Sequence, residues 1–160
     1  MNQERPSIEI VQKRLKEIKN KDIKCPNDGN KGKAGLIIEQ QVGIPTSSEC
    51  LDCTDGELKS VPVETASPRI RIGISGKNMP METTAVTMAN LESLEKDDWS
   101  ESRVKKKTNK VLFTEYKRFK KNDKEYIRCM NSVLFDENPK FDKLRKILEE
   151  DYIKIQEDYK

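Results

Sequence analysis

Two stretches near the start of the chain repeat apolar residues at helical spacing. Within residues 7–19, one helical face carries four of them: Ile8, Val11, Leu15 and Ile18. Ser7 precedes this face and is a favourable N-cap residue, so the pattern predicts a helix over 7–19. Good helix formers also fill residues 31–43, KGKAGLIIEQQVG, and they stop at Gly43, a residue type common just past a helix end. The pattern predicts a second helix there.

The middle of the chain changes to runs that are typical of β-strands. Three such runs follow one another: ELKSVPVE at 57–64, RIRIGIS at 69–75 and METTAVTMANL at 81–91. In the second run, isoleucine alternates with arginine or glycine, which is the period of a strand with two different faces. Three consecutive strands predict an antiparallel meander.

The C-terminal part of the chain combines a short helix, a hairpin and a long helix. Residues 100–107 predict the short helix, and the strand-like segments 111–119 and 125–135 flank the turn-like sequence KKND. Residues 139–159 carry one apolar helical stripe: Phe141, Leu144, Leu148, Tyr152, Ile155 and Tyr159. We assign this stripe and Trp99 to packing rather than to base stacking. The order of elements predicts an α+β (mixed α/β) fold.

Length and composition narrow the class of protein. A chain of 160 residues that is 34% hydrophobic can bury one modest core, so a single domain over 1–160 is predicted. No apolar run reaches the length of a membrane span and the N-terminus lacks a signal-peptide pattern, so we expect a cytoplasmic protein without membrane contact. The absence of histidine excludes Ser-His-Asp and Cys-His nucleophile systems. Enzymatic chemistry must therefore use carboxylates, lysines, hydroxyls or a metal.

The four cysteines permit a zinc site but do not favour one. Cys50 and Cys53 have two residues between them, whereas Cys25 and Cys129 are each isolated. A structural zinc site needs a second close pair of ligands. We therefore expect ordinary reduced thiols.

Positive charge is concentrated in residues 103–121, RVKKKTNKVLFTEYKRFKK. Nine lysines and arginines stand there against one acid, Glu115. The segment is a candidate surface for a polyanion, and a merely solvated lysine-rich surface explains the charge equally well. Its aromatic neighbours could line a DNA groove or cover the sheet: Tyr116, Phe119 and Tyr126.

Candidate chemistry lies at the start of the 57–64 run. Residues two apart on a strand share a face, so Glu57 and Lys59 project together, with Asp52 just upstream. Taken alone, such a pair is more often an exposed salt bridge. With Asp52, however, it matches the needs of phosphodiester hydrolysis, since acidic oxygens hold Mg²⁺ and an ammonium orients water or stabilises developing charge.

A further acid is supplied by the predicted second helix. Glu39 lies four residues after Gly35 and seven after Gly32, so the three share roughly one helical face, and the glycines leave it smooth enough for a nucleic-acid backbone. Glu39 could face the same metal. Lys31 and Lys33, at the start of this helix, would add phosphate donors beside its positive end.

Four stretches in order resemble the MutH family, which joins the mismatch-repair strand-nicking endonuclease to related type II restriction enzymes that cut at GATC. They are NKGKAGLIIE at 30–39, the loop and strand from 52 to 64, METTAVTM at 81–88, and WSESRVKKKTNKVLF at 99–113. The family lies within the PD-(D/E)xK nuclease superfamily. The resemblance implies a restriction-endonuclease-like core, with a central, mostly antiparallel sheet flanked by helices.

The resemblance also implies roles for individual residues. Glu39, Asp52 and Glu57 would be the acids of a Mg²⁺ site, and Lys59 would be the catalytic lysine. Because the loop before Glu57 is about two residues shorter than in the mismatch-repair nuclease, Asp55 is an alternative ligand, and we rank it below Asp52. The expected DNA-binding cations are Lys31, Lys33, Arg103, Lys105, Lys106, Lys107 and Lys110; Lys107 matches a family lysine implicated in DNA contact or catalysis.

These expectations define a function and one alternative. The expected function is Mg²⁺-dependent hydrolysis of double-stranded DNA, either nicking in repair with a MutL-type partner or restriction at a GATC-type site. The alternative is an inactive nuclease-like module that binds DNA or a partner. In the family, a portion after the long helix reads GATC, and the sequence given reaches only Lys160. We therefore expect one domain without that portion and carry over no sequence specificity.

Overall fold

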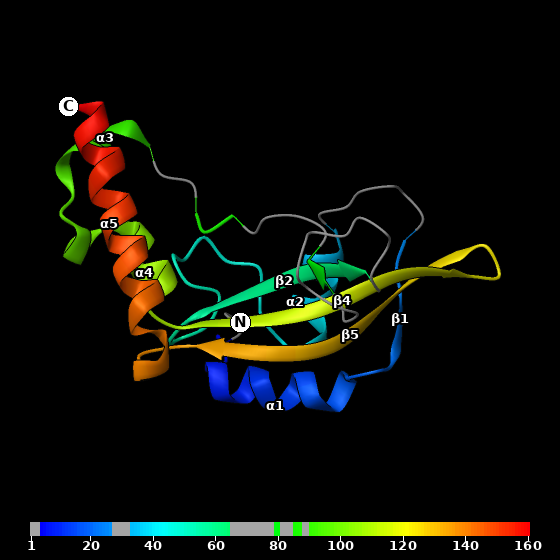
Figure 1. The fold of residues 1–160 in the computed structure, drawn as a ribbon. Coiled ribbons are helices and arrows are strands. Elements are labelled where there is room, and N and C mark those ends of the chain that lie inside the picture. Colours follow the sequence, from blue (N-terminus) through cyan, green and yellow to red (C-terminus); the bar gives the residue numbers. More distant parts are fainter. Residues whose placement is uncertain (1–3, 27–32, 65–78, 81–84, 88–89) are drawn as a thin grey trace.

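The two N-terminal helices form where the apolar pattern places them. The computed structural model describes residues 4–26, 33–64, 79–80, 85–87 and 90–160 (Figure 1). Helix α1 spans Ile8–Ile18, and the Ser7 hydroxyl caps it by accepting a hydrogen bond from the Ile10 N–H at 3.3 Å. Helix α2 spans Lys33–Gln41, and Gly43 follows it in the left-handed region at a φ of 77°. Both predicted helices are confirmed.

The strands form one mixed sheet in the order β1-β5-β4-β2-β3. Their bounds are Asp22–Lys24 (β1), Glu57–Glu64 (β2), Met79–Pro80 (β3), Val111–Lys121 (β4) and Lys124–Phe135 (β5). Strand β2 pairs in parallel with β4, while the other three pairings are antiparallel. The expected mixed fold with a mostly antiparallel sheet and flanking helices is confirmed.

The predicted hairpin is formed by β4 and β5. Asn122 and Asp123 connect the strands with φ angles of 51° and 59°, which is the backbone of a two-residue turn that matches strand twist. The register shifts between Thr114 and Tyr116, so the long hairpin contains a bulge. Its turn lies at the end of the sheet opposite the C-terminal helices (Figure 1).

Short helices precede the hairpin and a long one follows it. They are α3 (Leu91–Lys96), the 3₁₀ helix η1 (Trp99–Glu101), α4 (Arg103–Thr108), the 3₁₀ helix η2 (Pro139–Phe141) and α5 (Asp142–Tyr159). Ser102 caps α4 by accepting from the Lys105 N–H at 3.1 Å. Trp99 packs on Tyr152 of α5 with ring centroids 5.4 Å apart, which confirms its structural assignment.

The expected strand over 81–91 is wrong at its C-terminal end. Residues 85–87 form no strand and Leu91 begins α3, because Asn90 caps that helix by accepting from the Ser93 N–H at 2.7 Å. The rest of this run and the run at 69–75 fall on residues outside the described ranges, apart from residue 90. The expected meander also missed that β2 pairs with β4 in parallel.

The packing assignment of the C-terminal stripe is wrong for three of its members. Leu144, Ile155 and Tyr159 are 47%, 50% and 51% exposed, although Tyr152 is buried. The reason is length: α5 has 18 residues, and it contacts the short elements α3, η1 and η2. Such short neighbours cover only part of a long helix.

The main core lies between the sheet and the first two helices, and α1 runs along one face of the sheet in Figure 1. Leu58 of β2 and Leu112 of β4 belong to this core. Because alternate residues of a strand point to opposite faces, Glu57 and Lys59 project away from it. Within the described residues, no helix combines the length and apolar character that crossing a bilayer requires.

Candidate active site at the start of β2

The first residue of β2 is fixed between the loop before it and the end of α4. The Glu57 N–H donates to the Lys110 carbonyl at 2.9 Å, just before β4 begins. Gly56 permits this close approach, because an added Cβ would lie 2.6 Å from the Lys110 carbonyl oxygen and 2.7 Å from Ile8 Cγ1. The parallel pairing of β2 with β4 thus brings the site acids next to the basic helix.

The side chains of Asp52 and Glu57 both accept hydrogen bonds from backbone N–H groups of the 52–58 segment. The Asp52 N–H donates to Glu57 Oε2 at 2.9 Å, and the Leu58 N–H donates to Asp52 Oδ2 at 3.2 Å. Glu57 is only 1% exposed. Burial and the neighbouring Glu57 carboxylate raise the pKa of Asp52 above its usual range.

Two lysines supply positive charge to the buried Glu57 carboxylate. Lys107 of α4 donates from Nζ to Glu57 Oε1 at 2.5 Å, and its side chain is 13% exposed. Lys59 Nζ lies 4.0 Å from the same oxygen, and its side chain is 26% exposed. The expected pairing of Glu57 with Lys59 on one strand face is therefore present, but Lys107 makes the shorter contact.

Glu39 of α2 reaches the same group of charges. Burial raises its pKa first, the Asp52 and Glu57 carboxylates raise it further, and Lys59 opposes them. These electrostatic interactions join α2, the 52–56 loop and β2 at one place. The structure therefore brings three of the residues predicted to be catalytic into direct proximity, Asp52, Glu57 and Lys59, and Glu39 is linked to them through the effect of their charges on its pKa.

Asp55, the alternative ligand, has a different position and different partners. Its Oδ1 accepts from the Ile8 N–H at 2.8 Å, at the start of α1, and its Oδ2 accepts from Lys110 Nζ at 2.8 Å. Burial tends to raise the pKa of Asp55, but these two donors outweigh it and lower the pKa. Asp55 thus stabilises a helix N-terminus, which supports the ranking of Asp52 above it.

The expected DNA-binding cations are spread over several elements. Lys31 lies outside the described residues, and Lys33 begins α2. Arg103 donates from Nε to Thr87 Oγ1 at 3.2 Å, and Lys110 is held by Asp55, which raises its pKa. Lys105, Lys106 and Lys107 follow one another on α4, and Lys107 contacts Glu57.

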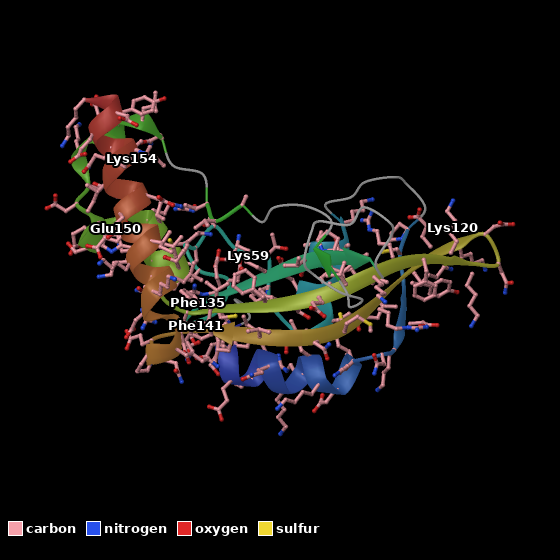
Figure 2. The ribbon with its side chains drawn as sticks, viewed as in Figure 1. Lys59, Lys120, Phe135, Phe141, Glu150 and Lys154 are labelled. Atoms are coloured by element: carbon pink, nitrogen blue, oxygen red, sulfur yellow. The ribbon has the colours of Figure 1, made fainter. Side chains whose placement is uncertain are left out.

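The rest of the basic run lies far from this site. Residues 117–121 form the outer end of β4, and Figure 2 shows Lys120 at the hairpin turn while Lys59 lies toward the C-terminal helices. Phe119 and Tyr126 stack there at 5.8 Å, with Arg128 above the Phe119 ring. Tyr116 instead lies in the main core.

Three of the cysteines are buried in the core. Burial raises the pKa of Cys129 to about 11, and burial together with the nearby acids raises that of Cys53 to about 12. Cys25 is also buried, and Cys50 is half-buried. These values keep the Cys53 and Cys129 thiols protonated at neutral pH in the metal-free protein.

The donor chemistry of the site fits a divalent cation that prefers oxygen. Glu39, Asp52 and Glu57 are carboxylates whose mutual repulsion a cation would relieve. Across the described part of the chain, however, no three acidic or cysteine side chains form a ready-made ligand shell. Both Glu57 oxygens instead accept hydrogen bonds, from the Asp52 N–H and from Lys107.

The sequence placed Lys107 among the DNA-binding cations and missed its contact with Glu57. The available signal was its position, because Lys107 lies four positions before Val111, the first residue of β4, and Val111 is paired with Glu57. That signal can be read only once β2 is known to pair with β4 in parallel. The pattern of apolar residues along single strands does not specify this pairing.

Comparison with known proteins gives a family match and likenesses to solved structures. Residues 46–151 match the family described as DNA mismatch repair enzyme MutH. No curated protein sequence matches the chain. Among solved structures, a complex of restriction endonuclease MvaI with its cognate DNA substrate covers 81% of this chain and 73% of its own, at 13% sequence identity and a TM-score of 0.46.

Proposed function

Because the chain belongs to the MutH family of DNA mismatch repair enzymes, we propose that it is a Mg²⁺-dependent endonuclease that hydrolyses phosphodiester bonds in double-stranded DNA. The observation that supports this proposal is the proximity of Asp52, Glu57 and Lys59 at the start of β2. The charges of these three residues also affect the pKa of Glu39. Three carboxylates and an ammonium are the groups that metal-assisted phosphodiester hydrolysis requires.

Each residue has a distinct part in this proposal. Glu39, Asp52 and Glu57 would hold the cation, which supplies a Lewis acid for a phosphate oxygen and for an attacking water. Lys59 projects from β2 on the same face as Glu57 and is partly exposed, so its ammonium can meet a substrate. There it would orient the water or stabilise the charge that develops on the phosphate.

The basic helix α4 would position the DNA. Lys107 of this helix contacts the site acid Glu57, and Lys106 is exposed. Ammonium groups on phosphates fix the register of a duplex but do not read its bases. Replacing Lys105 or Lys106 should therefore weaken binding to all DNA sequences alike.

The proposal is tested with supercoiled plasmid DNA in Mg²⁺ or in EDTA. Cleavage should require Mg²⁺, and Glu57→Ala or Lys59→Ala should each lower its rate by about 10²–10³-fold or more, because each removes a group that acts on the reacting phosphate. The matched controls are Glu92→Ala and Lys96→Ala, which remove an exposed pair on α3. Unchanged cleavage by both site variants would count against the assignment.

A second candidate function is a module that grips DNA or a repair protein without cutting. The observation that favours it is the engagement of both Glu57 oxygens by protein donors. A DNA-binding titration run beside the plasmid assay separates the two functions. Tight binding with no Mg²⁺-dependent cleavage would support the module.

Within the nuclease function, the product distinguishes repair from restriction. A repair nuclease would nick one unmethylated strand and accelerate with a MutL-type protein, whereas a restriction enzyme would cut both strands unaided. Gel analysis resolves nicked from linear plasmid. Addition of a MutL-type protein then tests the partner.

A further inference from the structure

The buried carboxylate of Glu57 is neutralised by the chain itself. Glu57 is 1% exposed, and an unpaired carboxylate at that depth is strongly unfavourable. Lys107 Nζ donates a charge-assisted hydrogen bond to Glu57 Oε1 at 2.5 Å. The ammonium therefore supplies the positive charge that Glu57 requires.

Lys107 competes with any cation for Glu57 Oε1. The Asp52 N–H donates to Oε2 and Lys107 to Oε1, so a protein donor already uses part of the acceptor capacity of each oxygen. Lys59 is a weaker competitor, since its Nζ is 4.0 Å from Oε1 and outside hydrogen-bond distance.

We propose that Lys107 is an internal counter-cation that holds Glu57 in the metal-free protein and is displaced from Glu57 Oε1 when a divalent cation binds. This inference rests on the proposed metal site. A lysine side chain suits the task, because its ammonium is a compact charge on a flexible four-carbon stem and can leave without moving the helix. The backbone of α4 stays fixed by the Ser102 cap.

The displaced ammonium gives the exchange a consequence for DNA binding. Lys107 belongs to the same helix as Lys105 and Lys106, so its release would add a free cation to α4, the helix proposed to contact phosphates. Metal binding would then favour DNA binding, and by linkage DNA would favour metal binding by the same factor. Binding of the divalent cation and binding of DNA would thus be coupled through the Lys107 side chain.

The test measures Mg²⁺ affinity by calorimetry without DNA, for the wild type and three variants. Lys107→Met removes the charge and keeps the length of the side chain, Lys107→Arg keeps the charge, and Lys59→Met is the matched control. Lys107→Met should bind Mg²⁺ at least about tenfold more tightly than wild type, because one charge-assisted hydrogen bond no longer competes. Lys107→Arg should show no such gain, and Lys59→Met a smaller one.

A measurement on the wild type keeps the test independent of how the variants fold. The Lys107 ammonium signal is followed by nitrogen-detected NMR while Mg²⁺ is added. The expected result is loss of the hydrogen-bonded signal as the cation binds. A signal that persists at saturating Mg²⁺ would show that ammonium and metal share Glu57, and this would overturn the inference.

The outcomes separate this inference from the proposed function. Mg²⁺ binding by the wild type with no gain in Lys107→Met overturns the exchange and leaves the nuclease proposal intact. Absence of Mg²⁺ binding in all four proteins overturns both. A gain in Lys107→Met that Lys107→Arg lacks supports the exchange.

Discussion

The two ends of the basic run at residues 103–121 have opposite surroundings in the folded protein. At the α4 end, Lys107 is 13% exposed and contacts the buried Glu57. At the hairpin turn, Lys120 and Lys121 are exposed, and their side chains have no acid partner within the described residues. Strand β4 carries the chain between these ends over about 33 Å, at roughly 3.3 Å per residue.

This contrast shows why the density of charge along a sequence does not identify what each charge does. Lys107 and Lys120 belong to one lysine-rich run, yet one neutralises a buried acid and the other faces water. The difference arises from the strand pairing, which places the start of β4 beside Glu57 and the end of β4 at a projecting turn. Two predictions test this contrast and one tests the acids beside its buried end, and they run from the largest expected effect to the smallest.

The first prediction concerns stability in metal-free buffer. Lys107→Ala should lower the free energy of unfolding by about 3–5 kcal/mol, since it leaves a buried carboxylate without its closest partner. Lys120→Ala should change it by no more than about 0.5 kcal/mol, as is usual for an exposed side chain. Urea denaturation measures both. Equal losses of unfolding free energy in Lys107→Ala and Lys120→Ala would contradict the proposed difference between the α4 end and the hairpin end of the basic run.

The second prediction concerns pH and the raised pKa of Glu39. An acid with a raised pKa in the folded state binds its proton more tightly than in the unfolded chain. The metal-free protein should therefore lose stability as the pH rises from 4.5, the ordinary pKa of Glu39, through its raised value. Asp52 acts in the same direction from 3.8, whereas the lowered pKa of Asp55 acts in the opposite direction and only below 3.8.

Urea denaturation at a series of pH values tests this prediction. Glu39→Gln should flatten the fall in stability above pH 4.5, because glutamine binds no proton. The exposed Glu92→Gln is the control. The prediction would be wrong if the wild-type protein became more stable as the pH rises over this range and Glu39→Gln abolished that gain.

The third prediction concerns the salt dependence of DNA affinity. Replacing Lys105 and Lys106 by alanine should reduce the slope of log affinity against log salt by about one unit per lysine. Replacing Lys120 and Lys121 should reduce it by less than about half a unit, because that end lies far from the site. Lys154→Ala, on α5, is the control. Equal slope changes would show that the whole run is one DNA surface.

Local elements could be predicted from the sequence because their signals are local. The Ser7 cap and the apolar face of α1 depend on residues within one helix, and the turn at Asn122 and Asp123 depends on residues within one hairpin. The acids of the site could also be predicted, since the spacing of Glu57 and Lys59 puts both on one strand face.

The remaining features depend on contacts between distant segments. The parallel pairing of β2 with β4 joins strands that lie far apart in the chain, and no periodicity specifies it. Leu144 and Ile155 are exposed because the neighbouring elements cover only part of α5. The helical pattern in the sequence shows that these residues share a face of the helix, but it does not show whether that face is covered. The contact of Lys107 with Glu57 was missed for the same reason, because the two residues lie 50 positions apart in the chain.

The central claim is that the acids at the start of β2 bind a divalent cation through Glu57. Calorimetric titration of Mg²⁺ into the wild type and into Glu57→Gln tests it most directly, because glutamine keeps the shape of the buried side chain and removes its charge. We predict one Mg²⁺ site in the wild type and in the control Glu92→Gln, and its loss in Glu57→Gln. Equal Mg²⁺ binding by Glu57→Gln and the wild type would contradict the claim.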